Sequence, residues 1–201
     1  MISKRLKAIS SFISSDDNLI DIGCDHALLD IYLVKNNIIA KCYVSDINPK
    51  ALDNAILNIK NNHLEDKITP ILGNGLDSIN DSHIDTIIIS GLGSYSIIDI
   101  LKNKIKLKNI AKIIIQANNN HYALRKFLEK INFYIQDEIV IYDNNKYYIT
   151  MLLKKGYKKY HYEDLLFGPV LKTKKENKKY FLYLKDSYQK ILRLLPRKKL
   201  I

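Results

Sequence analysis

The stretch Leu19-Ile20-Asp21-Ile22-Gly23-Cys24-Asp25-His26-Ala27 decides the fold of this 201-residue chain. Its apolar run stops at Gly23, polar residues follow, and a helical pattern begins at Leu28. A strand that ends on glycine lets the backbone approach a ligand closely, while the helix behind it offers unpaired N–H groups. We interpret the stretch as the first strand of an α/β sheet and its ligand-binding turn.

A second apolar run, Cys42-Tyr43-Val44, ends about twenty residues later at Ser45 and Asp46. Nucleotide-binding α/β folds place there a carboxylate that accepts hydrogen bonds from a ribose diol. The run therefore predicts a bound nucleoside. A dinucleotide is disfavoured, because it needs G-x-G-x-x-G at the first turn and no second glycine occurs until Gly73. S-adenosylmethionine has no pyrophosphate to cradle and suits this turn better.

Further along the chain, apolar runs alternate with helical patterns, which predicts a doubly wound parallel sheet. The further strands are expected at 68–72, 84–89 and 111–115, and the helices at 28–34, from Pro49 onward, 97–101 and 122–131. Two β-rich runs, Phe133–Tyr142 and Tyr147–Leu153, are joined by four polar residues and predict an antiparallel hairpin. Such a hairpin is the usual ending of the methyltransferase version of this architecture.

Composition limits the class of protein. No stretch approaches the ~20 apolar residues of a membrane span, and an amphipathic pattern follows the basic N-terminus where a signal peptide would be apolar. We expect a cytoplasmic protein with no membrane partner. Cys24 and Cys42 are the only cysteines and fall in or beside predicted strands, so we expect buried thiols and no metal site.

The net charge of +11 is concentrated at one end of the chain. Up to Lys154 there are 18 Lys and Arg against 17 Asp and Glu, whereas from Lys155 onward there are 14 against 4. We therefore divide the chain into a sheet domain, 1–155, and a basic helical domain, 156–201. Such an excess of positive charge favours a polyanionic partner.

Apolar residues in the tail follow a heptad-like spacing. The seam consists of Phe181, Leu184, Tyr188, Ile191 and Leu195, on a helix expected to end near Pro196. We expect this helix to pair with an earlier one at 162–167 as an antiparallel, coiled-coil-like arm. The lysines expected to remain solvated are Lys174, Lys175, Lys178, Lys179, Lys185 and Lys190.

Six motifs, in order over nearly the whole chain, resemble those of the bacterial tRNA adenine-N1 methyltransferases that act on position 22. They are Ser3-Lys4-Arg5-Leu6, Asp21 to Ala27, Gly73-Asn74-Gly75-Leu76, Ser90-Gly91-Leu92-Gly93, Gln116-Ala117-Asn118 and Phe167-Gly168-Pro169. The chain departs from the family in having Leu92 for methionine, Ser94 for glycine and Ala117 for proline. The resemblance implies a Rossmann-like class I fold and methyl transfer from S-adenosylmethionine to N1 of adenine in tRNA.

The same resemblance implies roles for individual residues. Asp25 is the expected catalytic carboxylate. The expected cofactor contacts are Asp21, Gly23, Asp46, Ile47, Asn74, Gly75 and Gly91. The expected contacts to tRNA are His26, Tyr95, Gln116, Asn118, Lys174, Lys178 and Lys185.

Other interpretations stay open at this point. Asp25 could serve only as a helix N-cap, and His26 only as a structural donor. The basic tail could be a solvated helical face. The chain could methylate a substrate other than tRNA, or bind RNA without catalysis. We expect a monomer, with a dimer left open.

Overall fold

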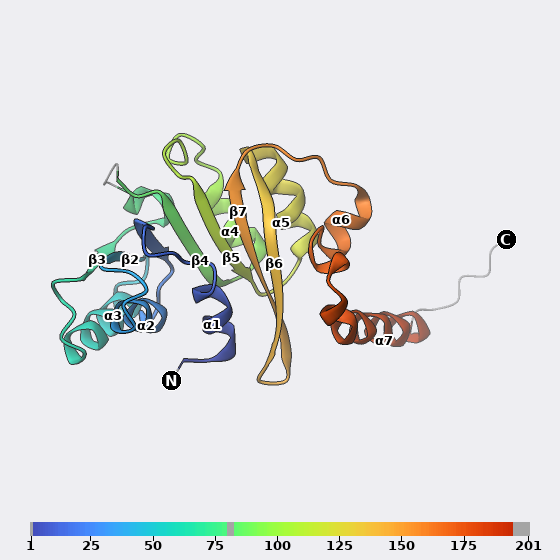
Figure 1. Cartoon of the computed structure of the whole chain (residues 1–201), viewed down its shortest axis with the longest axis horizontal. Helices are drawn as coiled ribbons and strands as arrows, with labels where there is room; N and C mark the ends of the chain where they lie inside the picture. The colour runs from blue at the N-terminus through green and yellow to red at the C-terminus, as the bar shows by residue number, and fades with distance from the viewer. Residues whose placement is uncertain (1, 80–82, 195–201) are drawn as a thin grey trace.

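The computed structural model describes residues 2–79 and 83–194, and its core is a seven-stranded sheet (Figure 1). The strand order is β3-β2-β1-β4-β5-β7-β6; β7 runs antiparallel to β5 and β6, and the other neighbouring strands pair in parallel. The strands are β1 (Leu19–Ile22), β2 (Cys42–Asp46), β3 (Ile68–Leu72), β4 (Thr86–Leu92), β5 (Lys112–Ala117), β6 (Phe133–Asp143) and β7 (Lys146–Lys155). The predicted Rossmann-like sheet closed by a hairpin is confirmed.

Helices cover both faces of the sheet (Figure 1). They are α1 (Lys4–Ser10), α2 (Leu28–Lys35), α3 (Pro49–Asn61), α4 (Ser94–Leu101), α5 (His121–Leu128), α6 (Tyr162–Phe167) and α7 (Lys178–Leu194). Ile9 and Leu33 belong to one apolar layer, between the sheet and α1 to α3. Ile97 and Leu124 belong to the other, on the side of α4 to α6. The sheet is thus sealed on both sides, as parallel strands require.

The central strands follow from their isoleucine runs. Ile87–Ile89 in β4 and Ile113–Ile115 in β5 are fully buried, because β-branched side chains fill both covered faces of a parallel strand. Both strands extend beyond the predicted apolar runs, since Ser90 still pairs with Gln116 through the backbone. This extension carries the ends of β4 and β5 to the edge where β1 and β2 also end.

The segment after the hairpin is tied to the sheet domain by a buried ion pair. Arg125 of α5 and Glu138 of β6 lie 2.9 Å apart and are almost fully buried. Arg125 Nη1 donates to the carbonyl of Leu165 at 3.1 Å, and Glu138 Oε2 accepts from the backbone N–H of Val170 at 3.0 Å. Every partner removes part of the desolvation cost of the pair. The first part of the tail is therefore fixed in place.

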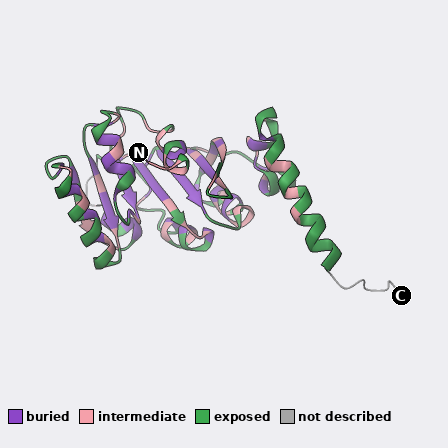
Figure 2. Ribbon diagram, turned by 90° about the horizontal axis from the view of Figure 1, so that it is seen from below, coloured by how far each residue is buried: buried purple, intermediate pink, exposed green. Residues whose placement is uncertain are grey.

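The expected antiparallel pairing of α7 with α6 is wrong. Phe167 and Phe181 touch at a ring-centroid distance of 6.4 Å, but α7 has no buried residue and extends away from the sheet domain (Figure 2). The reason is that α6 is only six residues long and buries Leu165 in the layer toward α5. Leu195 and Pro196, also part of the predicted helix, lie outside the described residues.

The structure also describes the two cysteines, the length of the helices and the surroundings of Lys174. Cys24 and Cys42 are buried, as predicted. No helix in the described part of the chain is long and apolar enough to cross a membrane. Lys174 is not solvated, because its Nζ donates to Asp137 Oδ1 at 2.6 Å and to the Glu138 carbonyl at 2.8 Å.

Candidate active site

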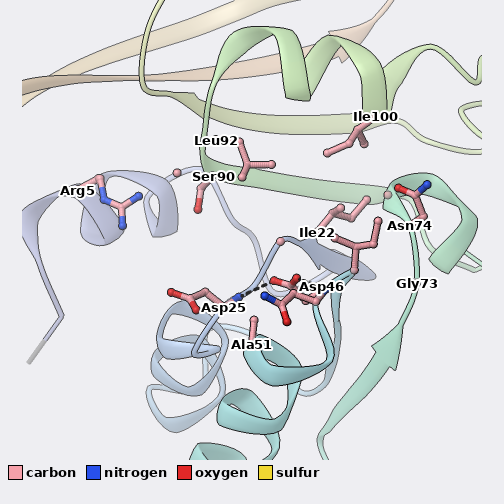
Figure 3. A pocket seen from close by; sticks show the side chains of 15 residues that line it. Arg5, Ile22, Asp25, Asp46, Ala51, Gly73, Asn74, Ser90, Leu92 and Ile100 are labelled. Atoms are coloured by element: carbon pink, nitrogen blue, oxygen red, sulfur yellow. Dashed lines mark hydrogen bonds between the residues drawn. The ribbon is translucent and has the colours of Figure 1, made fainter.

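A cavity of about 490 Å³ opens where β1, β2 and β4 end, the edge at which α/β folds bind ligands (Figure 3). Asp25, Asp46 and Ala51 lie on one side of it, Ser90 and Leu92 on another. The lining residues are Arg5, Ile22, Gly23, Asp25, Asp46, Ile47, Asn48, Ala51, Gly73, Asn74, Gly75, Ser90, Gly91, Leu92 and Ile100.

The first turn is held by β2. The N–H groups of Gly23 and Cys24 both donate to the carbonyl of Ser45, at 2.8 and 3.1 Å. Gly23 has φ +80°, a conformation that glycine adopts without a steric penalty. This geometry turns the chain sharply away from the strand and leaves the floor of the cavity free of side chains at Gly23.

Asp46 is oriented by two backbone donors. Its Oδ2 accepts from the Asp25 N–H at 3.3 Å, and its Oδ1 accepts from the Asn48 N–H at 2.8 Å. A carboxylate has about four acceptor positions, so both oxygens can still accept from a ligand. Asp46 therefore presents fixed acceptors to the cavity, as the recognition of ribose hydroxyls requires.

Asp25 is not a helix cap. The N-cap of α2 is Ala27, which has φ +52° and provides no side-chain hydrogen bond to the helix. The Asp25 carboxylate lies 3.6 Å from His26 Nε2 and is largely exposed. Capping alone thus does not explain Asp25, and its negative charge is available at the cavity.

Arg5 reaches the cavity from α1, on the side opposite Asn74 (Figure 3). Its Nη1 donates to Gln116 Oε1 at 2.8 Å, and its guanidinium carbon lies 5.8 Å from the centre of the Tyr148 ring. Sequence reasoning did not select this residue as part of the site. In the sequence, Arg5 is marked only by the Ser3-Lys4-Arg5-Leu6 motif. That motif does not indicate a role for Arg5, because only the fold brings α1 next to the cavity.

Two amides expected to bind substrate brace the turn after β5 and tie it to the end of β4. Gln116 is fully buried, and its Nε2 donates to the Ala117 carbonyl at 3.0 Å and to Asn118 Oδ1 at 3.3 Å. Asn118 Nδ2 donates in turn to the Gly91 carbonyl at 2.6 Å. These hydrogen bonds hold the turn even though Ala117 replaces the proline of the family.

The remaining expected tRNA contacts lie outside the cavity lining. His26 is exposed next to Asp25. Tyr95 is exposed outside the lining, and its hydroxyl accepts from Asn120 Nδ2 at 3.1 Å. Lys178 and Lys185 are exposed on α7.

Asp21, expected to contact the cofactor, is buried outside the cavity lining. It faces Asp30 of α2, and Asp30 Oδ1 lies 3.9 Å from Cys42 Sγ. Burial, and then repulsion from Asp30, raises the pKa of Asp21 well above its ordinary value. Burial likewise raises the pKa of Asp30 to about 7. The two carboxyls therefore hold a proton in the range where exposed carboxyls are ionised.

Comparison with known proteins assigns the family. A family model described as a methyltransferase domain matches residues 2–152. The chain belongs to this methyltransferase family. The match covers the sheet domain from α1 through most of β7, and it includes every residue that lines the cavity. The methyltransferase interpretation of the sheet and hairpin is thereby confirmed.

Similar proteins narrow the assignment within this methyltransferase family. The tRNA (adenine(22)-N(1))-methyltransferase of Bacillus subtilis is 28% identical over 87% of this chain and 76% of its own length. A Streptococcus pneumoniae protein described as a putative tRNA (m1A22) methyltransferase, solved with S-adenosyl-L-methionine, is 30% identical with a TM-score of 0.91 and coverages of 97% and 92%. M. capricolum TrmK, solved with S-adenosyl-homocysteine, is 33% identical with a TM-score of 0.86 and coverages of 99% and 90%. The resemblance seen in the six motifs is confirmed.

Proposed function

We propose that this methyltransferase transfers the methyl group of S-adenosylmethionine to N1 of adenine 22 in tRNA. The observation that carries the proposal is the cavity itself, which brings Gly23 and Asp46 together with Asp25 and Arg5. We assign Gly23 and Asp46 to the nucleoside of the cofactor. Relatives that carry this activity in their names match 87% and 97% of this chain. A non-catalytic RNA-binding protein would not need to preserve this cavity.

The residues present fit S-adenosylmethionine. A volume of about 490 Å³ suits a small-molecule ligand. Asp46 would accept from the ribose hydroxyls, Ile47 and Asn74 would border the adenine, and the backbone at Gly23 and Gly91 would lie along the methionine portion. When bound, the cofactor supplies an electrophilic methyl group.

The acceptor chemistry requires little proton transfer. Neutral adenine carries a lone pair on N1, so the site needs mainly to align that nitrogen with the methyl carbon. Methylation makes the ring cationic, and a fixed negative charge stabilises that charge as it develops. We assign this role to Asp25, which also can accept from the exocyclic amine and so favour adenine over guanine.

Arg5 provides a positive charge at the same cavity. One N–H of the Arg5 guanidinium donates to Gln116 Oε1, and its four other N–H groups are available to a ligand. A guanidinium in this position matches the geometry of a phosphate. We assign Arg5 to the phosphate next to the target adenine.

Delivery of the adenine requires that the base leave its stack, which costs a few kcal/mol. We assign contacts with the extruded base to His26, which lies next to Asp25 of the lining, and to Tyr95, since both side chains are exposed. Lys178 and Lys185 on α7 would hold the tRNA backbone through phosphate contacts. We propose that the chain acts on tRNA in the cytoplasm as a monomer, since its strongly basic tails repel one another.

The test is to locate the methyl group on unmodified tRNA after incubation with the protein and S-adenosylmethionine. We expect 1-methyladenine at position 22 and no methylation of a matched transcript carrying guanine there. Methylation at another nucleotide, or of a non-RNA substrate only, would contradict the proposal. Light scattering of the free protein tests the monomer.

A further inference from the structure

Four tyrosines form a cluster outside the cavity, where the tip of the β6–β7 hairpin meets the start of α7. This tyrosine cluster consists of Tyr142, Tyr147, Tyr180 and Tyr183. The Tyr147 ring is central, with centroid distances of 4.8 Å to Tyr142, 5.2 Å to Tyr180 and 4.9 Å to Tyr183. The hairpin and a helix distant from it in sequence are thus joined by aromatic rings.

The cluster is packed but not buried. Tyr142 is 52% exposed and Tyr183 is 53% exposed, although each touches Tyr147. Aromatic side chains usually bury most of their surface, and an exposed group of them marks an interaction site. The described residues leave both of these side chains open to a partner.

Cations lie on both faces of the hairpin tip. Arg5, which lines the cavity, has its guanidinium carbon 5.8 Å from the centre of the Tyr148 ring, and Lys146 Nζ lies 5.3 Å from the same ring. Tyr147 and Tyr148 are consecutive in β7, so their side chains point to opposite faces, and the cluster lies on the face toward α7. On that helix Lys178, Lys179 and Lys185 are exposed and flank the cluster tyrosines in sequence. Figure 1 shows the hairpin tip reaching past the sheet edge between α1 and α7.

Basic side chains interleaved with aromatic rings are typical of surfaces that bind unpaired nucleotides, whose bases stack on the rings. A second copy of this chain is disfavoured as the partner, because the tails carry the same positive charge. We propose that the tyrosine cluster stacks an unpaired base of the tRNA, separate from the adenine in the cavity. The inference rests on the proposed function and adds a second surface of the protein that contacts tRNA.

The experiment measures the affinity of the full chain for unmodified tRNA by fluorescence anisotropy. The test variants are Tyr142→Leu and Tyr183→Leu, alone and combined, since both side chains are exposed. We expect the combined variant to weaken binding about tenfold, in keeping with the value of one stacked base. The corresponding Tyr→Phe variants should bind like the parent, because phenylalanine also stacks.

Tyr157 supplies a matched control. It is 69% exposed and follows the end of β7 that lies away from the hairpin tip, where the Lys155 N–H donates to the Ala111 carbonyl beside the start of β5. Tyr157→Leu should leave tRNA affinity unchanged. Melting temperature and S-adenosylmethionine affinity, measured on each variant, should equal those of the parent, so a weaker affinity for tRNA reports the surface.

Three outcomes would overturn the inference. One is parental tRNA affinity in the combined leucine variant, and another is an equal weakening in the phenylalanine variants. The third is a parent dimer that the leucine variants dissociate, which would make the cluster a self-association surface. If the cluster binds tRNA but adenine 22 is not methylated, only the proposed function fails, because binding and methyl mapping are separate measurements.

Discussion

Two carboxylates at the cavity, Asp25 and Asp46, are joined through one backbone hydrogen bond but face different tasks. Asp46 is held by the N–H groups of Asp25 and Asn48, which fixes the acceptor that we propose for the ribose. Asp25 has a largely exposed carboxylate and no capping role. Substitutions at these two positions can therefore separate an effect on cofactor binding from an effect on the rate of methyl transfer.

We predict that Asp25→Asn lowers the methyl-transfer rate about 100-fold, the size of effect seen when one preorganised electrostatic interaction is removed from an active site. Its affinity for S-adenosylmethionine should stay within about threefold of the parent. Asp46→Ala should instead weaken S-adenosylmethionine binding by roughly tenfold or more, because it removes hydrogen bonds to the ribose.

Calorimetric titration with the cofactor and single-turnover methylation of tRNA separate the two effects. If Asp25→Asn turned over at the parent rate, the catalytic assignment of Asp25 would be wrong. If Asp46→Ala bound the cofactor like the parent, the nucleoside would have to be recognised by other lining residues.

A second prediction concerns the buried carboxyl pair. Burial raises the pKa of Asp30 to about 7 and that of Asp21 in the same direction, so folding takes up protons where the unfolded carboxyls are ionised. Stability from this pair is therefore present at low pH and is lost as the pH rises through about 7. One oxygen of each carboxyl, Asp21 Oδ1 and Asp30 Oδ2, has no hydrogen-bond partner among the described residues.

We expect Asp30→Asn to gain stability relative to the parent by about 1–3 kcal/mol between about pH 5 and about pH 8, since asparagine does not ionise. Urea unfolding at the two pH values measures this difference. Burial also lowers the pKa of His121 to about 4, which acts in the opposite direction but cancels between parent and variant. A difference that does not change with pH would show that the pair is not the titrating group.

Residues at strand ends could be predicted from sequence, because a glycine or acid that follows an apolar run lies at the sheet edge. Gly23, Asp46 and Asn74 line the cavity for this reason. Asp21 and Gln116 could not be placed, because each lies within a strand and its side chain points into the protein interior. Arg5 could not be found either, because its position depends on contacts with residues more than a hundred positions away.

At the scale of elements, the short segment after the hairpin is fixed by one buried ion pair. Gly168 has φ +91°, and a Cβ there would lie 2.7 Å from Glu138 Oε2 and 2.9 Å from Arg125 Nη2. Only glycine fits at this position without displacing the pair. The glycine of the Phe167-Gly168-Pro169 motif is thereby explained by packing.

We predict that Gly168→Ala lowers the free energy of unfolding by about 3 kcal/mol or more, because it disturbs a buried ion pair and strains the backbone. Gly93→Ala is the matched control: Gly93 has φ −73° and a Cβ there would lie 3.6 Å from Asn119, so the cost should stay below about 1 kcal/mol. Denaturant unfolding of both variants provides the comparison. Equal costs would mean that the ion pair tolerates displacement.

The strands and the hairpin could be predicted because each has a local pattern, an isoleucine run or two β-rich segments with a polar turn. The partner of α7 could not. A heptad-like seam shows that a helix has an apolar stripe but does not show what covers it. Here Phe181 touches α6 and Tyr180 and Tyr183 touch the hairpin, while Tyr188 and Ile191 stay exposed.

For the whole molecule, charge is distributed between a nearly neutral sheet domain and a strongly basic tail. We predict that Lys178→Ala with Lys185→Ala reduces the slope of log affinity for tRNA against log salt by roughly two, about one for each phosphate that no longer pairs with a lysine. Binding measured at several salt concentrations tests this. An unchanged slope would remove both lysines from the RNA interface.

Lys174→Ala is the control for this experiment. Its side chain already pairs with Asp137 and the Glu138 carbonyl, so its removal should lower stability and leave the salt slope unchanged. If Lys174→Ala changed the slope as much as an α7 lysine, the ion pair with Asp137 would have to open on binding.

The two halves of α7 differ: Tyr180 and Phe181 pack against the core and Tyr183 against the hairpin, whereas every residue from Tyr188 to Leu194 is exposed. Selection on the exposed half acts through the sign of its side chains and hardly through their volume. Over evolutionary time that half can drift freely as long as lysine or arginine keeps recurring, whereas the residues around Gly168 that anchor the helix cannot change in size. Saturation mutagenesis would find α7 from Tyr188 onward indifferent to bulk and sensitive to acidic replacements.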